Sequence, residues 1–296
     1  MKILYLLPLV LLAACSSEVP EKSLSESKPT TVVGELVPTT SRYFNFVPTP
    51  SILIFSETRD WRHEEGIAGA NLAIMKAAKE MGHGYYTTEH SGIFNEKDLA
   101  RFDVVVFNNM TGDALTPEEE TAFAKWQSKG NGTVLLHGAG DDSHQDWDFY
   151  HNEVLGATFV SHPMDPQFQE ARVEVLAPKH PVMQGLPSEF MATDEWYTFE
   201  AVPSDDFIVL AGLDESTYSP VNNAYGDRSD LRMGPKTSDH PIIWARCLGD
   251  NQARTVFTAM GHRYETFETT EALLILKNML NWAAKKTDPE SSGCAK

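Results

Sequence analysis

The stretch TVLLHGAGDDSH, from Thr133 to His144, decides how the rest of the chain is interpreted. Its apolar first third is typical of a buried parallel strand, which stops at His137. Gly138 and Gly140 allow the tight backbone turn that such a strand needs at its end. Ligand sites in open α/β sheets lie at the carboxyl ends of strands, so His137 is the first candidate site residue. The alternative is a strand followed by an acidic surface turn.

Segments on both sides of this stretch alternate between short apolar runs and helical periodicity. Gly82 is placed to end one helix, and Thr116-Pro117 is a typical helix start. Because crossovers between such strands are right-handed, the order predicts a doubly wound, mostly parallel α/β sheet. The predicted strands cover residues 52–55, 85–88, 104–107, 133–136, 171–175, 208–210, 242–245 and 255–258, and the predicted helices cover residues 64–81, 96–100, 116–129, 147–155 and 271–284.

The segment 157–213 is less regular than the part before it. We expect it to form an antiparallel extension that covers one side of the site. Residues 214–239 are polar, and we expect them to form a long functional loop.

The chain is strongly acidic, with 24 Lys and Arg residues against 42 Asp and Glu residues and a formal net charge of -18. Binding to a nucleic-acid backbone requires clustered Lys and Arg to neutralise phosphates. The composition therefore argues against nucleic acid as a partner. It sets no expectation for the oligomeric state.

The first fifteen residues indicate an export signal. Lys2 precedes an apolar run over 3–12, which is too short to span a bilayer comfortably and is typical of a secretory signal. Because Leu12-Ala13-Ala14 is followed at once by Cys15, the segment resembles a bacterial lipoprotein signal. That resemblance implies cleavage before Cys15, lipidation of its thiol, and an extracytoplasmic protein anchored to a membrane. The absence of aspartate after Cys15 favours the outer membrane. An ordinary signal peptide with an incidental cysteine is the alternative.

The composition predicts the division of the remaining chain. Residues 16–49 are rich in Ser, Thr, Pro and Glu and are expected to form a disordered tether. Residues 50–286 form the predicted folded domain, and residues 287–296 form a tail. Cys247 and Cys294 can pair, although an extracytoplasmic location does not by itself require a disulfide.

Several polar side chains follow the predicted strands and are expected to share one site. His63 begins a predicted helix after the first strand, Asn108 follows the third, His137 the fourth, and His262 the last. Trp61 and Glu64 flank His63 and are predicted to contact substrate with it and with Asn108. For any one histidine, the alternative is a hydrogen-bonded structural role.

The run Asp194-Glu195-Trp196-Tyr197 places two acids beside two aromatic residues. An acid against an aromatic wall can have a raised pKa and exchange protons, and aromatic rings suit the apolar faces of a sugar. The alternative is an ordinary loop with a buried tryptophan. His162 is a further predicted substrate contact, whereas His180 is expected in a turn.

A divalent metal ion, such as zinc, is a possible cofactor. His137, His144, His262 and Glu195 are the right ligand types for zinc. No short-range ligand spacing such as His-Glu-x-x-His occurs, so no metal ligand is assigned from the sequence.

The order of the motifs resembles the ThuA-like family, which is named for trehalose utilisation. The resemblance covers residues 51–284, nearly all of the predicted domain. It implies the fold of class I glutamine amidotransferases, with a flavodoxin-like sheet. Those enzymes carry a nucleophilic cysteine after a strand, whereas the comparable turn here holds His137, so a thiolate route is unsupported. The matching motifs are Ile54-Phe55-Ser56-Glu57-Thr58, Arg62-His63-Glu64, Leu136-His137-Gly138, Trp147 with Tyr150, His162-Pro163, His180-Pro181-Val182, Gly185-Leu186-Pro187, Asp194-Glu195-Trp196-Tyr197, Pro241-Ile242-Ile243-Trp244 and Gly261-His262.

The resemblance implies carbohydrate chemistry, including that of 3-keto sugars. We expect an enzyme that acts on a sugar or keto-glycoside by hydrolysis, elimination or isomerisation. His137 and His262 are the predicted acid/base pair, with Glu195 as a second proton-transfer group or a metal ligand. His63 and Asp194 are expected to orient hydroxyls, and Trp61, Trp196 and Tyr197 to act as stacking walls. The alternatives are a non-catalytic carbohydrate-binding lipoprotein and a metal-dependent hydrolase.

Overall fold

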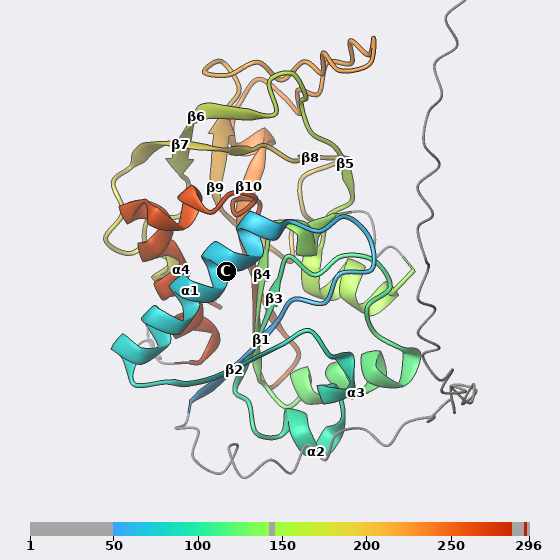
Figure 1. Cartoon of the computed structure of the whole chain (residues 1–296). Coiled ribbons are helices and arrows are strands. Elements are labelled where there is room, and N and C mark those ends of the chain that lie inside the picture. Colours follow the sequence, from blue (N-terminus) through green and yellow to red (C-terminus); the bar gives the residue numbers. More distant parts are fainter. Residues whose placement is uncertain (1–49, 142–145, 286–292, 295–296) are drawn as a thin grey trace, which may run out of the picture. The chain divides into compact units, whose positions relative to one another are not determined.

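Strands form the centre of the folded part, and helices lie on both sides of them (Figure 1). The computed structural model describes residues 50–141, 146–285 and 293–294. The strands are β1 (Ser51–Phe55), β2 (Gly84–Thr88), β3 (Val104–Asn108), β4 (Gly132–Leu136), β5 (Phe159–Ser161), β6 (Phe168–Val175), β7 (Glu189–Glu195), β8 (Thr198–Phe199), β9 (Ile208–Asp214), β10 (Pro241–Leu248) and β11 (Ala253–Thr258). The α-helices are α1 (Glu64–Met81), α2 (Glu96–Leu99), α3 (Pro117–Gln127) and α4 (Thr270–Ala283).

The main sheet has nine strands in the order β2-β1-β3-β4-β11-β10-β9-β6-β7. The first five of these are parallel to their neighbours, and their order is that of flavodoxin-like folds. The remaining four pair antiparallel. The structure therefore confirms the doubly wound, mostly parallel sheet with an antiparallel extension.

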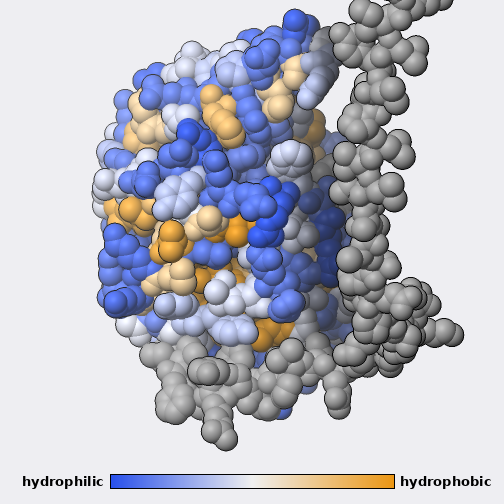
Figure 2. Space-filling view, viewed as in Figure 1, coloured by the Kyte–Doolittle hydropathy of each residue, from blue (hydrophilic) through white to orange (hydrophobic). Residues whose placement is uncertain are grey.

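The central strands are buried on both faces, which explains their continuous apolar sequences. Helices α1 and α4 pack together on one face of the parallel part, and α2 and α3 pack together on the other (Figure 1). Figure 2 shows that the visible surface is mostly hydrophilic, with apolar residues in separate patches.

The helix ends follow the predicted signals. Helix α1 ends at Gly82, whose φ of 71° is the left-handed conformation that glycine adopts readily. Helix α3 starts with a capping box in which Thr116 and Glu119 satisfy each other's backbone N–H groups. The predicted helix over 147–155 is instead a π-helical turn over Tyr150–Leu155, followed by Gly156 in the left-handed region.

Two structural features of the extension were not predicted. Strand β7 pairs along β6 and ends at Glu195, and β5 pairs with β8 in a separate two-stranded sheet. The segment between β9 and β10 is mainly loop, with a short 3₁₀ turn at Thr237–Asp239. The buried His240 ties this loop to the fold, because its ring nitrogens contact Glu215 Oε1 at 2.6 Å and the Tyr197 carbonyl oxygen at 2.9 Å.

Cys247 and Cys294 form a disulfide, which joins the last described residues to β10. The pairing that the sequence left open is therefore present. Among the described residues, no helix combines the length and the apolar character needed to cross a bilayer. Cys15, the predicted signal and tether, Asp142, His144 and most of the predicted tail lie outside the described residues, so those assignments stay predictions.

Candidate functional site

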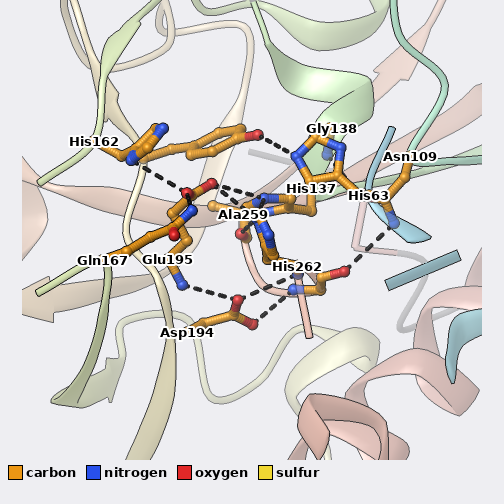
Figure 3. Close-up of polar contacts among 12 residues, drawn as sticks. His63, Asn109, His137, Gly138, His162, Gln167, Asp194, Glu195, Ala259 and His262 are labelled. Atoms are coloured by element: carbon orange, nitrogen blue, oxygen red, sulfur yellow. Dashed lines mark hydrogen bonds and ion pairs between the residues drawn. The ribbon is translucent and has the colours of Figure 1, made fainter. Parts of the chain in front are cut away.

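Four side chains from four separate segments converge at the carboxyl edge of the parallel strands (Figure 3). His63 immediately precedes α1, His137 follows β4, Glu195 ends β7, and His262 lies in the turn after β11. His137 has a φ of 41°, a left-handed conformation that is rare for a residue with a Cβ atom. Backbone strain of this kind is concentrated at functional sites, and here it directs the imidazole towards the other three groups.

Three ligand-type atoms form a nearly equilateral triangle. His137 Nε2 lies 3.2 Å from His262 Nδ1 and 3.2 Å from Glu195 Oε2, and the last two atoms are 3.0 Å apart. Bond lengths of about 2.0–2.1 Å in a tetrahedral zinc site place neighbouring ligand atoms about 3.3 Å apart. The triangle therefore has nearly the size of one face of such a site.

His63 completes the cluster, and one ligand atom from each of the four residues lies within 4.8 Å of the others. Its ring centroid is 4.9 Å from that of His137 and 4.7 Å from that of His262. The buried Nδ1 of His63 has no hydrogen-bond partner among the described residues. This nitrogen lies against Gly138, where an added Cβ would be 2.8 Å away, and the other ring nitrogen, Nε2, lies 3.4 Å from the Tyr197 hydroxyl.

The hydrogen bond on the far side of His137 fixes its tautomer. His137 Nδ1 lies 2.6 Å from the carbonyl oxygen of Ala259, which can only accept, so Nδ1 carries the proton. The other nitrogen, Nε2, then faces Glu195 and His262 as an acceptor unless the ring is protonated. Metal-binding histidines are typically oriented by a backbone carbonyl in this way.

Both oxygens of Glu195 are engaged. His137 and His262 approach Oε2, while Oε1 accepts a hydrogen bond from Gln167 Nε2 and lies 3.2 Å from His162 Nδ1. No sequence motif indicates Gln167, because its role depends on the pairing of β6 with β7, which sets Phe168 opposite Glu195. Gln167 holds the carboxylate in place without adding charge.

The electrostatics of the cluster keep the carboxylate ionised. Burial alone would raise the pKa of Glu195, but the hydrogen bonds from His137 and His262 lower it below its usual range. The expectation of a raised pKa at Glu195 was therefore wrong. Burial would also lower the pKa of His137, yet the hydrogen bond and charge of Glu195 raise it overall. For His63, burial and the neighbouring His137 and His262 lower the pKa to about 2.

Asp194 is fully buried and bonds to the turn that carries His262. Its buried carboxylate accepts hydrogen bonds from Gly261 N at 2.7 Å, His262 N at 3.2 Å and Thr266 Oγ1 at 2.8 Å. These bonds fix the turn that carries His262. The predicted role of Asp194 in orienting substrate hydroxyls is therefore replaced by a structural one.

Amide side chains hold the neighbouring turns. Asn108 Nδ2 donates to Ile67 O and to Asn71 Oδ1, which binds the end of β3 to α1. Asn109 Oδ1 accepts the Gly138 N–H at 3.1 Å and so fixes the turn after His137. The side chain of Asn108, a predicted substrate contact, thus bonds to α1. Asn109 supports the turn after His137 and was not among the predicted site residues.

The predicted aromatic walls fall into different environments. Tyr197 lies in the site, with its ring centroid 4.2 Å from that of His137 and its hydroxyl 3.4 Å from His63 Nε2. Trp196 is fully buried and donates its indole N–H to the Gln169 carbonyl, so it offers no face to a ligand. Trp61 is 68% exposed. Glu64 is exposed and pairs with Arg62 at 3.4 Å, away from the cluster.

The cluster meets solvent on the side of His162 and His262. Their side chains are 25% and 14% exposed, whereas those of His137 and Glu195 are 0% and 2% exposed. Burial lowers the pKa of His162, although the charge of Glu195 opposes that shift. A substrate can therefore approach over His162 and His262, with His137 behind them. His180 lies in a turn, as predicted, where its Nδ1 accepts the Val182 N–H.

The amidotransferase route has no support in the described residues. Their two cysteines are joined in the disulfide, and the Gly138 N–H beside His137 is already bonded to Asn109. A thiolate nucleophile with a free backbone donor next to it is therefore not formed at this turn. The arrangement instead offers imidazoles and one carboxylate, which can hold a divalent metal ion or relay protons.

Comparisons with known proteins identify the family. The family model for ThuA, described as trehalose utilisation, matches residues 51–283. A putative ThuA-like protein from Bacteroides uniformis is 24% identical, with a TM-score of 0.65 over 80% of this chain and 92% of that one. A second, from Parabacteroides merdae, is 16% identical, with a TM-score of 0.60 over 81% and 91% of the two chains. No curated protein matches. The chain belongs to the ThuA family.

Proposed function

We propose that this protein is a metal-dependent enzyme that acts on a sugar or keto-glycoside outside the cytoplasm. The observation that carries the proposal is the triangle of His137 Nε2, His262 Nδ1 and Glu195 Oε2, with separations of 3.0–3.2 Å. Three protein ligands with an open fourth position are typical of catalytic zinc sites. In this assignment the three atoms hold the ion, and His63 is the remaining polar group beside it.

Charge supports the same assignment. Glu195 is ionised and buried among imidazoles, one of which must be protonated to offset its charge when no cation is bound. A divalent ion, held by His137, His262 and Glu195, would take the place of that proton. It can then polarise a carbonyl or hydroxyl oxygen of the substrate, or activate a water molecule.

The substrate class follows from the family and from the chemistry of the site. ThuA proteins are associated with trehalose utilisation. A keto group in a sugar acidifies the neighbouring C–H bond, and an ion held by His137, His262 and Glu195 would supply Lewis-acid chemistry beside such a group. His63 is buried beside the ligands, and its pKa of about 2 keeps it neutral and makes it a weak base, so we assign it to orient a substrate hydroxyl and not to accept the proton.

The proposed location rests on the sequence and on the disulfide. The Leu12-Ala13-Ala14-Cys15 motif favours lipidation at Cys15, and the lack of aspartate after Cys15 favours the outer membrane. Disulfides persist in oxidising compartments and are rare in the cytosol, and Cys247 and Cys294 are paired. Mass spectrometry of the membrane fraction tests this part, because a diacylglycerol-modified Cys15 is expected at the new amino terminus.

Metal analysis and chelation test the catalytic assignment. The mature protein is expected to copurify with, or take up, one zinc ion, and to lose turnover of 3-keto-trehalose in EDTA and regain it with zinc. His137→Ala, His262→Ala and Glu195→Gln should each lose the metal. His90→Ala, an exposed histidine away from the cluster, is the matched control and should keep it. A wild-type protein that binds no divalent metal would refute the assignment.

A second candidate is supported by the raised pKa of His137. In that case His137 and His262, linked through Glu195, act as a metal-free acid/base pair on the same substrates. Chelation separates the two mechanisms, because the metal-free pair keeps full turnover in EDTA. Binding of intact glycoside without product in a long incubation would instead identify a non-catalytic carbohydrate-binding protein.

A further inference from the structure

An exposed phenylalanine borders the open side of the cluster. Phe168 is the first residue of β6 and pairs across the ladder with Glu195. It is 37% exposed, and its ring centroid lies 5.0 Å from that of His262, at an interplanar angle of 66°. The strand pairing therefore fixes an aromatic ring beside two of the cluster residues.

Arg263 lies against the same ring. Its guanidinium carbon is 5.1 Å from the Phe168 centroid, and its Nη2 pairs with Glu265 at 3.2 Å. Since Arg263 directly follows His262, the turn after β11 places an imidazole and a guanidinium at one aromatic ring. We call Phe168 and Arg263 together the Phe168 platform.

Single exposed apolar side chains are common on protein surfaces, so the surroundings of Phe168 matter more than its exposure. The side chains that contact the ring are polar: the Arg263 guanidinium lies over it, and the His262 ring meets it at an angle of 66°. An apolar face surrounded by hydrogen-bonding groups is typical of a ligand site.

A pyranose ring has the complementary chemistry. Its C–H faces are apolar and can stack on an aromatic ring, while its hydroxyl groups lie around the rim. The guanidinium of Arg263 offers several N–H donors to those hydroxyls, and His162 offers a ring nitrogen. The platform lies on the side from which His262 is reached, so a sugar bound there is next to the ligands that would hold the metal ion.

We propose that the Phe168 platform is a subsite that stacks one pyranose ring of a di- or oligosaccharide while the adjoining unit lies at the His/Glu cluster. The assignment of the adjoining unit as the reacting one rests on the proposed function. The platform itself requires only that a sugar binds. It makes a substrate with two sugar units better bound than a single sugar.

Calorimetry with trehalose and with glucose as probes tests the subsite. Phe168→Leu keeps an apolar side chain and the strand pairing but removes the aromatic face. We expect it to weaken trehalose binding about tenfold, which corresponds to about 1.4 kcal/mol, and to leave little preference for trehalose over glucose. Tyr85→Leu is the matched control, because Tyr85 is 41% exposed on β2, at the opposite edge of the sheet. It should bind trehalose as the wild type does.

Two further measurements separate this proposal from the metal assignment. Zinc content should be unchanged in Phe168→Leu, and saturation-transfer NMR should show contact between sugar C–H protons and the wild-type protein that the variant loses. If the protein binds no metal but trehalose binding still depends on Phe168, the subsite is supported and the metal assignment is refuted. Equal trehalose affinity in Phe168→Leu and Tyr85→Leu, or no trehalose binding by the wild type, would overturn it.

Discussion

Removing the carboxylate of Asp194 should uncouple the turn of His262 from the rest of the site. Asp194 is fully buried and accepts hydrogen bonds from two backbone N–H groups of that turn and from Thr266 Oγ1. In Asp194→Ala the N–H groups of Gly261, His262 and Glu195 lose this acceptor. A buried donor left unsatisfied costs about 1–3 kcal/mol, so the two in the turn alone give a loss of about 2–6 kcal/mol in the free energy of unfolding.

The same change should weaken metal binding, because the position of His262 Nδ1 depends on the turn. The assay is urea unfolding followed by tryptophan fluorescence, with the disulfide intact, together with a zinc titration below the transition. Asp230→Ala is a control, since that exposed carboxylate pairs only with Arg232 two residues away in the contacts described. It should change stability by less than about 0.5 kcal/mol.

The two readouts make the reasoning refutable. If Asp194→Ala loses less than about 1 kcal/mol, the buried N–H groups have found other partners and the structural role is wrong. If the variant loses stability but binds zinc with wild-type affinity, Asp194 supports the fold without positioning His262. A loss of zinc affinity that exceeds any change in the unfolding midpoint supports the assignment most directly.

Three other substitutions test separate features. Gly138→Ala should lower turnover with little change in zinc content or in secondary structure by circular dichroism, because the added Cβ would lie 2.8 Å from His63 Nδ1 and displace that ring, which is not one of the three proposed ligands. Replacing both Cys247 and Cys294 with serine should lower the free energy of unfolding by about 2–4 kcal/mol in a denaturant titration, since the disulfide joins residues 47 positions apart in the sequence. Burial lowers the pKa of His180 to about 4 in the folded state, below its unfolded value of about 6.5, so folding disfavours the protonated form. Stability should therefore fall by about 1–3 kcal/mol between pH 6.5 and pH 4, and this loss should be smaller in His180→Asn, as unfolding at several pH values would show.

The parallel part of the fold was predictable because its strands carry the signal in their own residues. Residues 104–107 and 133–136 are continuous apolar runs, as buried parallel strands must be, and the predicted helix 64–81 coincides with α1. The histidines that follow these strands were predictable for the same reason. Once the strand order is known, His137 and His262 must lie at one edge.

The extension was predicted only in outline, because its strands are stabilised by pairing more than by their own pattern. Strand β7, EFMATDE, has a polar sequence with two acids at its end, so it does not suggest a buried position for Glu195. Its partner β6 begins three residues before the predicted strand. The sequence therefore did not indicate that Gln167 and Phe168 lie beside Glu195. The roles of Asp194 and Trp196 likewise depend on partners 67 and 27 residues away in sequence.

The parallel strands and the antiparallel extension of the main sheet contribute different groups to the site. The parallel strands supply imidazoles at fixed positions, and the turn after β4 presents His137 with the strained backbone that a nucleophile would need. The extension then supplies the one carboxylate of the cluster, Glu195, and the groups around it, Gln167 and Phe168. A carboxylate held between two imidazoles gives this edge a donor set that suits a cation. Because β6 and β7 carry both Glu195 and the exposed Phe168 ring, a shift of β6 against β7 would move the carboxylate and the ring together.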